Sequence, residues 1–285
     1  MSELHSFAIC GSGYIGSFII SAFLARDSPP KLIVLSRNPK SKNYPPQVTV
    51  VRVDDYGDVD NVARILMAHK IDAVLSTVGY GGIRAQREMA DAAKKANIML
   101  FVPSEFGSPT DDAPNEDEDT KWRSLEYINA IGLSWAKFYT GGFINTALYS
   151  VTGVRVNGKI NIIGKGQNPV SFTLEEDIGG FVAHVLTSLP LSSLSNKIFR
   201  LEGDRGSLQD IAEWYHKEVA YVEAIPGPRS ENLSMLSKVF ESGAGSTGWS
   251  FQHGREGKGC SAAGSANKLW QTHRWKKIRD VITSL

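Results

Sequence analysis

Three glycines near the start of the chain have the spacing of a phosphate-binding turn. Residues 11–16 read Gly-Ser-Gly-Tyr-Ile-Gly, a G-x-G-x-x-G pattern. In such a turn the first glycine allows a tight bend, the second lets the backbone approach a pyrophosphate, and the third lets the following helix pack closely. The pattern favours dinucleotide binding over a purely structural turn between a strand and a helix. The candidate cofactor-binding residues here are Gly11, Ser12, Gly13, Tyr14, Ile15 and Gly16.

A basic segment follows the second apolar run of the chain, residues 31–35. It begins with Ser36 and Arg37, and Lys40 and Lys42 come shortly after. An acidic residue at this point would bind the ribose 2′-hydroxyl of NAD, whereas an arginine accommodates the 2′-phosphate of NADP. Ser36, Arg37 and Lys40 are therefore predicted to bind NADPH, with Lys42 as an alternative to Lys40. A solvated basic loop without a ligand is the other interpretation.

Alternating strands and helices are expected to position these residues. Apolar runs typical of buried strands lie at residues 7–10, 31–35, 48–53, 73–75 and 98–102. Helical periodicity lies between them, at residues 15–23, 60–69 and 85–96. This alternation predicts an α/β fold, a Rossmann-like doubly wound parallel sheet with helices on both faces.

Ligands of such sheets bind beyond the carboxyl ends of the strands. The loop after the fourth run therefore adds three candidate cofactor-binding residues, Thr77, Val78 and Gly79. The loop after the fifth run, residues 103–107, lies on the same edge and contains Phe106. A sixth strand is expected at residues 134–139. The candidate substrate-binding residues are Phe106, Gly142 and Phe143.

The composition limits the classes of function. The 285 residues carry a formal net charge of +1, which gives no reason to expect nucleic acid or an anionic membrane as a partner. No apolar run is long enough to span a bilayer, and no signal peptide is expected. Two cysteines, Cys10 and Cys260, are typical of a reduced, cytoplasmic setting, and no spacing of ligand residues indicates a metal. A small molecule is the expected partner, and a homodimer is compatible with the sequence.

The alternation of strands and helices weakens beyond about residue 151. We therefore expect an NAD(P)-binding domain at residues 1–150 and a smaller substrate-covering part at residues 151–285. Residues 242–264 are rich in glycine and serine, which predicts a flexible loop that closes over substrate.

Local signals predict three further elements in the second half. Residues 154–163 are expected to form a hairpin that turns at Asn157-Gly158. Asp177 is the expected N-cap of a helix at residues 178–186, and Ser207 is the expected N-cap of a helix at residues 208–219.

An acidic loop at residues 110–120 precedes a helix that begins at Lys121. Asp119 or Thr120 is the expected N-cap. Leu125 and Ile128 share a face with Lys121, so Lys121 would lie at the inner end of a buried face.

Several stretches, taken together, resemble one family, the NmrA-like and isoflavone reductase-like atypical short-chain dehydrogenases. They are residues 11–16, Ser36-Arg37, residues 72–79, Pro103-Ser-Glu-Phe-Gly107, Lys121 before residues 132–135, Gly142-Phe143, residues 173–178 and residues 267–270. The resemblance implies a Rossmann-like fold, NADPH as cofactor, and reduction of a small aromatic or phenylpropanoid-like compound. Some relatives bind the nucleotide only to regulate a protein partner, which is the alternative function.

The resemblance also implies a catalytic residue. The catalytic lysine of the family opens the helix before the sixth strand, and Lys121 has this place. An ammonium beside the nicotinamide could bind the ribose, as a cofactor-binding residue, and polarise a carbonyl or stabilise an oxyanion. The alternative is an exposed lysine at a polar helix start.

The chain departs from the family pattern at two positions. Cys10 stands where a further glycine is usual, and Leu125 stands where reductases of the family often carry an arginine. In addition, no Tyr-x-x-x-Lys sequence exists, so the usual acid–base pair of short-chain dehydrogenases is excluded. Nucleotide binding is expected despite these departures, and the substrate is left open.

Overall fold

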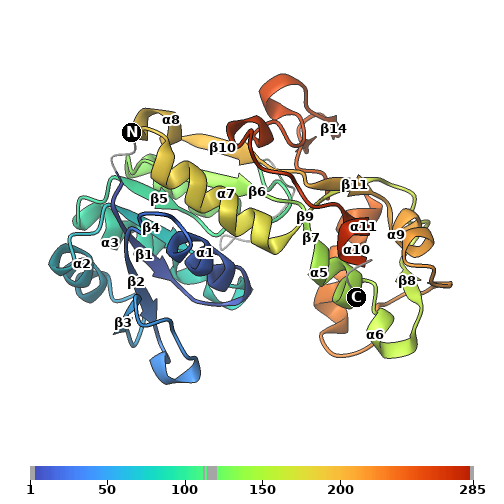
Figure 1. Cartoon of the computed structure of the whole chain (residues 1–285), viewed down its shortest axis with the longest axis horizontal. Coiled ribbons are helices and arrows are strands. Elements are labelled where there is room, and N and C mark those ends of the chain that lie inside the picture. The colour runs from blue at the N-terminus through green and yellow to red at the C-terminus, as the bar shows by residue number, and fades with distance from the viewer. Residues whose placement is uncertain (1–3, 112, 114–120, 283–285) are drawn as a thin grey trace. The chain divides into compact units, whose positions relative to one another are not determined.

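The computed structural model describes residues 4–111, 113 and 121–282 (Figure 1). The N-cap predicted at Asp119 or Thr120 lies outside the described residues, as does most of the acidic loop. The chain forms two compact units, each built from segments that are distant in sequence. Unit 1 comprises Met1–Glu105, Pro114–Lys137 and Gly179–Ile198, and unit 2 comprises Phe106–Ala113, Phe138–Ile178 and Phe199–Leu285.

A five-stranded sheet forms the centre of unit 1, in the order β3-β2-β1-β4-β5. Its strands are β1 (Ser6–Cys10), β2 (Lys31–Ser36), β3 (Thr49–Arg52), β4 (Ala73–Ser76) and β5 (Leu100–Val102). All neighbouring strands are parallel. The predicted α/β fold with a parallel sheet is therefore confirmed, and the five predicted strands are in their expected places.

The strand order reverses next to β1. The chain proceeds from β1 to β2 and β3 on one side, and then returns to add β4 and β5 on the other. Cys10, at the end of β1, pairs in register with Ser76, at the end of β4. Ligands of doubly wound sheets bind at such a switch point, so the fold brings the loops after Cys10 and Ser76 to one crevice.

Three helices cover one face of the sheet, α2 (Val59–Ala68), α3 (Gln86–Lys95) and α4 (Lys121–Ala130). Alternate residues of β1 point to this face, so Ala8 and Cys10 pack in one core with Val62 of α2 and Met89 of α3. Leu125 joins the same core from α4.

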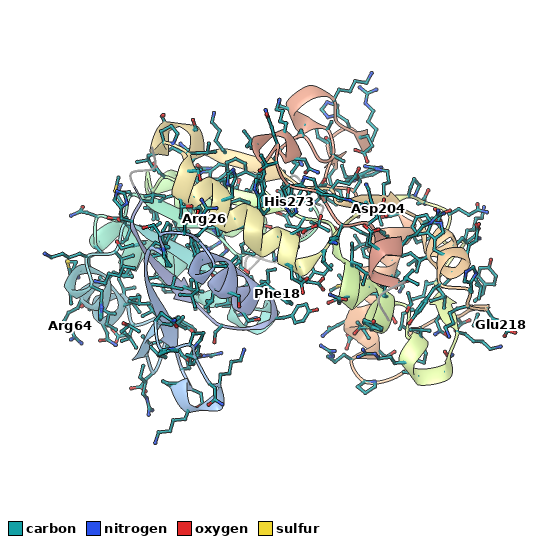
Figure 2. All side chains as sticks on the ribbon, in the orientation of Figure 1. Phe18, Arg26, Arg64, Asp204, Glu218 and His273 are labelled. Atoms are coloured by element: carbon teal, nitrogen blue, oxygen red, sulfur yellow. The ribbon has the colours of Figure 1, made fainter. Side chains whose placement is uncertain are left out.

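Two helices cover the opposite face, α1 (Tyr14–Leu24) and α7 (Glu175–Ser188). The ring of Phe7 in β1 lies 4.6 Å from that of Phe23 in α1. Helix α7 lies against α1, because a Cβ at Gly179 would come within 2.6 Å of the Phe18 carbonyl oxygen. At the other end of the contact, Arg26 donates to the Ser188 hydroxyl at 3.3 Å (Figure 2).

Unit 1 also contains the short helices η1 (Pro39–Ser41), η2 (Tyr80–Ala85) and α8 (Leu191–Leu194). The sixth strand, β6 (Ala136–Tyr139), pairs with β10 (Lys197–Arg200) rather than within the five-stranded ladder. Just before β6, Trp135 forms a parallel bridge with Phe101 of β5. The chain before β6 therefore runs beside the fifth strand.

Unit 2 is built from short strands and helices around its own core. Its sheets are β11-β9-β7, β12-β8 and β13-β14. Its strands are β7 (Gly142–Phe143), β8 (Ile160–Ile162), β9 (Val170–Thr173), β11 (Asp204–Gly206), β12 (Val219–Tyr221), β13 (Trp249–Ser250) and β14 (Arg255–Glu256). Its helices are α5 (Ile144–Thr146), η3 (Ala147–Val151), α6 (Val154–Asn157), α9 (Leu208–Trp214), α10 (Ser230–Glu241), η4 (Gly259–Ser261), η5 (Asn267–Leu269) and α11 (Ile278–Ile282).

The hairpin predicted at residues 154–163 is wrong. Residues 154–157 form helix α6, and Gly158 ends it with a φ of +76°. Strand β8 then pairs in parallel with β12 instead of folding back on the preceding residues. The Asn-Gly pair ends a helix instead of turning a hairpin, and glycine also favours a helix C-terminus.

The two predicted N-caps have different outcomes. Ser207 forms a capping box with Asp210, as its hydroxyl accepts from the Asp210 N–H at 3.1 Å. Asp177 is not an N-cap, because α7 already begins at Glu175. Its carboxylate instead accepts from the Lys276 backbone N–H at 2.8 Å and from His273 Nε2 at 2.9 Å (Figure 2). Asp177 therefore anchors the C-terminal segment.

The segment predicted to be flexible, residues 242–264, has two parts. In the first, Thr247 is buried and its N–H donates to the Ser171 hydroxyl at 3.0 Å. Arg205 donates to the Ser246 hydroxyl at 2.8 Å and pairs with Glu256 of β14 at 3.0 Å. Residues 251–261 are largely exposed. The predicted flexibility stays a prediction; within the exposed residues 251–261, Glu256 is held by its ion pair with Arg205.

No helix in the described part of the chain is long and apolar enough to cross a bilayer. Within the same residues, no group of three or more His, Cys, Asp or Glu side chains is placed to hold a metal ion.

Candidate functional site

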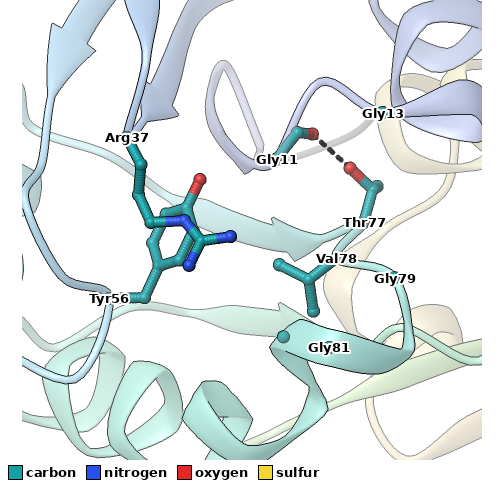
Figure 3. A pocket seen from close by; sticks show the side chains of 9 residues that line it. Gly11, Gly13, Arg37, Tyr56, Thr77, Val78, Gly79 and Gly81 are labelled. Atoms are coloured by element: carbon teal, nitrogen blue, oxygen red, sulfur yellow. Dashed lines mark hydrogen bonds between the residues drawn. The ribbon is translucent and has the colours of Figure 1, made fainter.

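A cavity of about 320 Å³ lies at the switch point of the unit 1 sheet (Figure 3). Its lining residues follow β1, β2, β3 and β4 in the chain. They are Gly11, Gly13, Arg37, Tyr56, Thr77, Val78, Gly79, Gly81 and Gly82. Six of these nine residues were predicted as cofactor-binding, so the structure brings the glycine turn, the basic segment and the fourth-strand loop together.

The glycine turn is fixed to its neighbours by hydrogen bonds. Gly11 has a φ of +90°, which favours glycine, and its N–H donates to the Leu35 carbonyl at 3.3 Å. The Thr77 hydroxyl donates to the Gly11 carbonyl (Figure 3), and the Thr77 N–H donates to the Cys10 carbonyl at 2.9 Å. The loop after β4 is therefore hydrogen-bonded to the turn and to the end of β1.

The second and third glycines have different surroundings. A Cβ at Gly13 would meet the Thr77 carbonyl oxygen at 3.9 Å, an ordinary contact distance. A Cβ at Gly16 would lie 2.5 Å from the Thr77 hydroxyl and 2.7 Å from the Gly11 carbonyl. Gly16 is therefore required by the packing of α1 on the turn, whereas Gly13 leaves open space on the cavity side.

Helix α1 begins directly at the cavity. Gly13 is its N-cap and supplies no capping side chain, and no acidic residue lies in the first turn. The N-terminal end of the helix dipole is positive, so this end suits an anionic ligand. Of the predicted residues here, Ser12 and Ile15 do not line the cavity, and the Tyr14 side chain is 52% exposed.

Arg37 supplies the charge of the cavity. It is the single cationic residue among the nine described residues that line it. Its guanidinium lies 5.6 Å from the centre of the Tyr56 ring, and the Tyr56 hydroxyl donates to the Leu35 carbonyl at 2.8 Å. Burial raises the pKa of the Tyr56 hydroxyl, and it raises the pKa of the Cys10 thiol beneath the turn to about 12. Both groups are therefore neutral at physiological pH, and the cavity is cationic.

The basic segment after Arg37 folds back toward the glycine turn. Lys40 is exposed in η1 and is not among the cavity residues, whereas Lys42 donates from Nζ to the Ser12 carbonyl. The Ser12 hydroxyl also bonds to the Tyr44 hydroxyl at 2.6 Å. The structure thus brings Lys42, not Lys40, to the turn. The buried Ser36 hydroxyl accepts from the Asn38 N–H at 3.2 Å, outside the cavity.

The loop after β5 is hydrogen-bonded to the cavity-lining loop after β4 and to the start of α3. The Ser104 hydroxyl donates to the Val78 carbonyl at 2.8 Å, and the Ser104 N–H donates to Gln86 Oε1 at 2.7 Å. Gln86 is fully buried at the start of α3. Its structural role was not predicted, because the sequence around it shows only a helix start.

Lys121 is the first residue of α4 and is partly buried. Leu125 and Ile128 point into the core, as predicted, and Tyr127 joins α4 to α3 by donating to Asp91 at 2.7 Å. Lys121 is not among the described residues that line the cavity. Leu125 is 6% exposed. A buried leucine of the core therefore occupies the position where reductases of the family often carry an arginine.

The predicted substrate-binding residues belong to unit 2, where Phe106 is buried and Gly142 and Phe143 are partly buried. The Phe106 ring stacks on Phe138 at 6.0 Å. Gly142 has no room for a side chain, because a Cβ there would lie 2.8 Å from Phe240. Phe143 is partly exposed, and the residues after it are fixed by the buried Glu175 carboxylate, which accepts from the Asn145 N–H at 3.3 Å.

Comparisons with known proteins agree with this geometry. The model of the NmrA-like family matches residues 7–233. Oxidoreductase aprR of Aspergillus flavus is 30% identical over 208 residues, which are 70% of this chain and 68% of aprR. Phenylcoumaran benzylic ether reductase 1 of Arabidopsis thaliana is 28% identical over 254 residues, 82% of this chain and 80% of that protein. Among solved structures, the leucoanthocyanidin reductase–NADPH complex of Vitis vinifera shares the fold, with a TM-score of 0.75 at 19% identity over 98% of each chain.

Proposed function

The chain belongs to the NmrA-like family, and on that premise we propose that it is an NADPH-dependent reductase of a small aromatic, phenylpropanoid-like compound. The observation that carries the proposal is the cationic cavity at the switch point, with Arg37 beside the glycine turn. The relatives support the reaction class, since they are named as an oxidoreductase and a phenylcoumaran benzylic ether reductase.

The residues of the cavity fit a dinucleotide phosphate. The open space at Gly13 and the start of α1 would hold the pyrophosphate, and Arg37 would hold the 2′-phosphate. Lys42 is the better candidate for a second cation, because it already contacts the turn. Bound NADPH supplies a hydride to the substrate.

The substrate half of the proposal rests on residues that the cavity does not include. Lys121 would stabilise negative charge that develops on the substrate during reduction. Phe106, Gly142 and Phe143 stay the predicted substrate-binding residues. The division into a cofactor part at residues 1–150 and a substrate part at residues 151–285, a cytoplasmic location and a homodimer stay predictions from the sequence.

One experiment tests the function as a whole. The purified chain is titrated with NADPH and with NADH, and then screened for NADPH oxidation with phenylcoumaran, pinoresinol, isoflavone and quinone substrates. We expect tighter binding of NADPH and turnover of at least one aromatic class. Tight NADPH binding without turnover, together with nucleotide-dependent association with a protein partner, would replace this proposal with a nucleotide-sensing regulator.

Replacing Arg37 with aspartate should reverse the cofactor preference. A hydrogen bond to a charged group contributes about 1.5–3 kcal/mol, so loss of the phosphate contact should weaken NADPH binding by roughly tenfold to a hundredfold. NADH binding should be unchanged or stronger, because a carboxylate suits the ribose 2′-hydroxyl. Dissociation constants from fluorescence titration give both values. Arg64→Asp is the matched control, since Arg64 is exposed on α2 and outside the cavity; equal weakening by both changes would contradict a specific role for Arg37.

Residues 251–261 should become protected when cofactor and substrate are both bound. Ordering an exposed, glycine-containing segment has an entropic cost that contacts with a ligand can offset. Hydrogen exchange should slow in residues 251–261 of the ternary complex, while residues 244–248, which are already fixed by Ser171 and Arg205, should show no change. The same exchange rates with and without ligands would show that this segment is not a lid.

A further inference from the structure

Tyr56 lines the cavity without offering a polar group to a ligand. It is 5% exposed, and its hydroxyl donates to the Leu35 carbonyl at 2.8 Å. Because burial raises the pKa of the hydroxyl, it keeps its proton and stays a donor at all physiological pH values. What Tyr56 presents to the cavity is therefore the face of its ring.

The position of the ring is fixed from both ends. The Leu35 carbonyl accepts from both the Tyr56 hydroxyl and the Gly11 N–H, so the ring is tied to the same atom as the glycine turn. At the backbone, the Val53 N–H donates to the Ser36 carbonyl at 3.1 Å, which extends the pairing of β3 with β2. The Gly57 N–H donates to the Asp55 carboxylate at 2.9 Å. The ring is thus a rigid part of the cavity wall.

The Arg37 side chain has more rotamer freedom than the Tyr56 ring. Its side chain is long and exposed, and an arginine loses considerable rotamer freedom when it is held in one place. Its guanidinium lies over the Tyr56 ring, 5.6 Å from the centroid (Figure 3). A cation over an aromatic face is attracted by the ring quadrupole, and a planar guanidinium also stacks on it. The ring therefore limits where the guanidinium can lie before any ligand arrives.

We propose that Tyr56 is a positioning residue for cofactor choice, which holds the Arg37 guanidinium at the place where the 2′-phosphate of NADPH binds. The inference rests on the proposed function, since it concerns the same cavity. NADH lacks the 2′-phosphate, so its affinity does not depend on the position of Arg37. Tyr56 thereby acts on the ratio of the two affinities and not on nucleotide binding in general.

The test is the ratio of the NADH and NADPH dissociation constants in Tyr56→Leu and Tyr56→Phe. Loss of a cation–π contact at an exposed site should lower this ratio by about twofold to fivefold in Tyr56→Leu. Tyr56→Phe keeps the ring and should keep the ratio, although it loses the hydrogen bond to Leu35 and should unfold at a lower temperature. The KM values for the two nucleotides should follow the same pattern, with kcat unchanged.

A double-mutant cycle separates positioning from a general effect on the cavity. In an Arg37→Ala background, Tyr56→Leu should leave the ratio unchanged, because the group that it positions is absent. If Tyr56→Leu does not fold, fluorinated phenylalanine analogues at position 56 replace it. Fluorination weakens the negative potential of the ring face, so the ratio should fall as fluorine atoms are added.

The outcomes are distinct. A wild-type chain that prefers NADPH and a Tyr56→Leu variant with the same ratio would overturn the role of Tyr56 and leave the proposed function intact. An equal fall of the ratio with and without Arg37 would also overturn it, since Tyr56 would then act independently of Arg37. A wild-type chain that binds neither nucleotide would overturn both proposals.

Discussion

Replacing Lys121 with methionine is expected to reduce kcat by about a hundredfold or more, the usual scale for an acid–base or oxyanion-stabilising group. Methionine keeps most of the side-chain volume and removes the charge. NADPH affinity should change much less, because Lys121 is not among the described residues that line the cavity. The measurement is steady-state turnover of a substrate found by the screen, with an NADPH titration on the same variant.

The control for Lys121→Met is Lys95→Met. Lys95 is an exposed lysine at the end of α3 that pairs with Asp60 at 2.6 Å. This control should keep the wild-type kcat and lose little stability, as exposed ion pairs contribute little. A Lys121→Met variant with wild-type turnover would show that the lysine is not catalytic.

Replacing Gly13 with valine should abolish measurable NADPH binding without unfolding the chain. The nearest described atom to a Cβ at this position is the Thr77 carbonyl oxygen at 3.9 Å, and the φ of −67° is accessible to any residue. The added side chain would instead occupy the space expected for the pyrophosphate. A modest loss of stability is expected, because valine is a poorer N-cap than glycine.

Gly16→Ala gives the opposite result and serves as the comparison. Its Cβ would lie 2.5 Å from the Thr77 hydroxyl and 2.7 Å from the Gly11 carbonyl, so α1 would have to move off the turn. Thermal unfolding should show a clearly lower midpoint for Gly16→Ala than for Gly13→Val. NADPH binding with wild-type affinity by a folded Gly13→Val protein would remove the glycine turn from the proposed site.

The parts of the site that follow regular elements directly could be predicted from the sequence. Gly11, Arg37 and Thr77 each come within a few residues of the end of an apolar strand. Parallel strands place their carboxyl ends on one edge, so local patterns were enough to bring these residues together. The strand order follows from the same alternation, since it matches that of a doubly wound sheet.

Tyr56 could not be predicted in the same way, because its role depends on Leu35 of β2 and on Arg37 directly after β2. The sequence shows only a tyrosine after two aspartates, and these partners become its neighbours when β2 and β3 pair. The errors at Asn157-Gly158 and Asp177 have a related cause. Both local signals are real, but each suits more than one structure, and distant partners such as β12 and His273 decide between them.

Helix α7 reaches the sheet of unit 1 only after the chain has passed through residues 138–178, which belong to unit 2. Its side chains Phe181, Val182, Val185 and Leu186 are fully buried, and Gly179 contacts the backbone of α1. While the protein is being synthesised, a nascent chain of about 150 residues would already hold all five strands of the sheet but not this cover. The part of this apolar face that α1 does not cover would then stay in water until residue 188 has left the ribosome, a state that favours aggregation and chaperone binding. The nucleotide-binding unit therefore completes its folding after most of the chain has been made, so a chain truncated after residue 150 would aggregate more readily than the full chain.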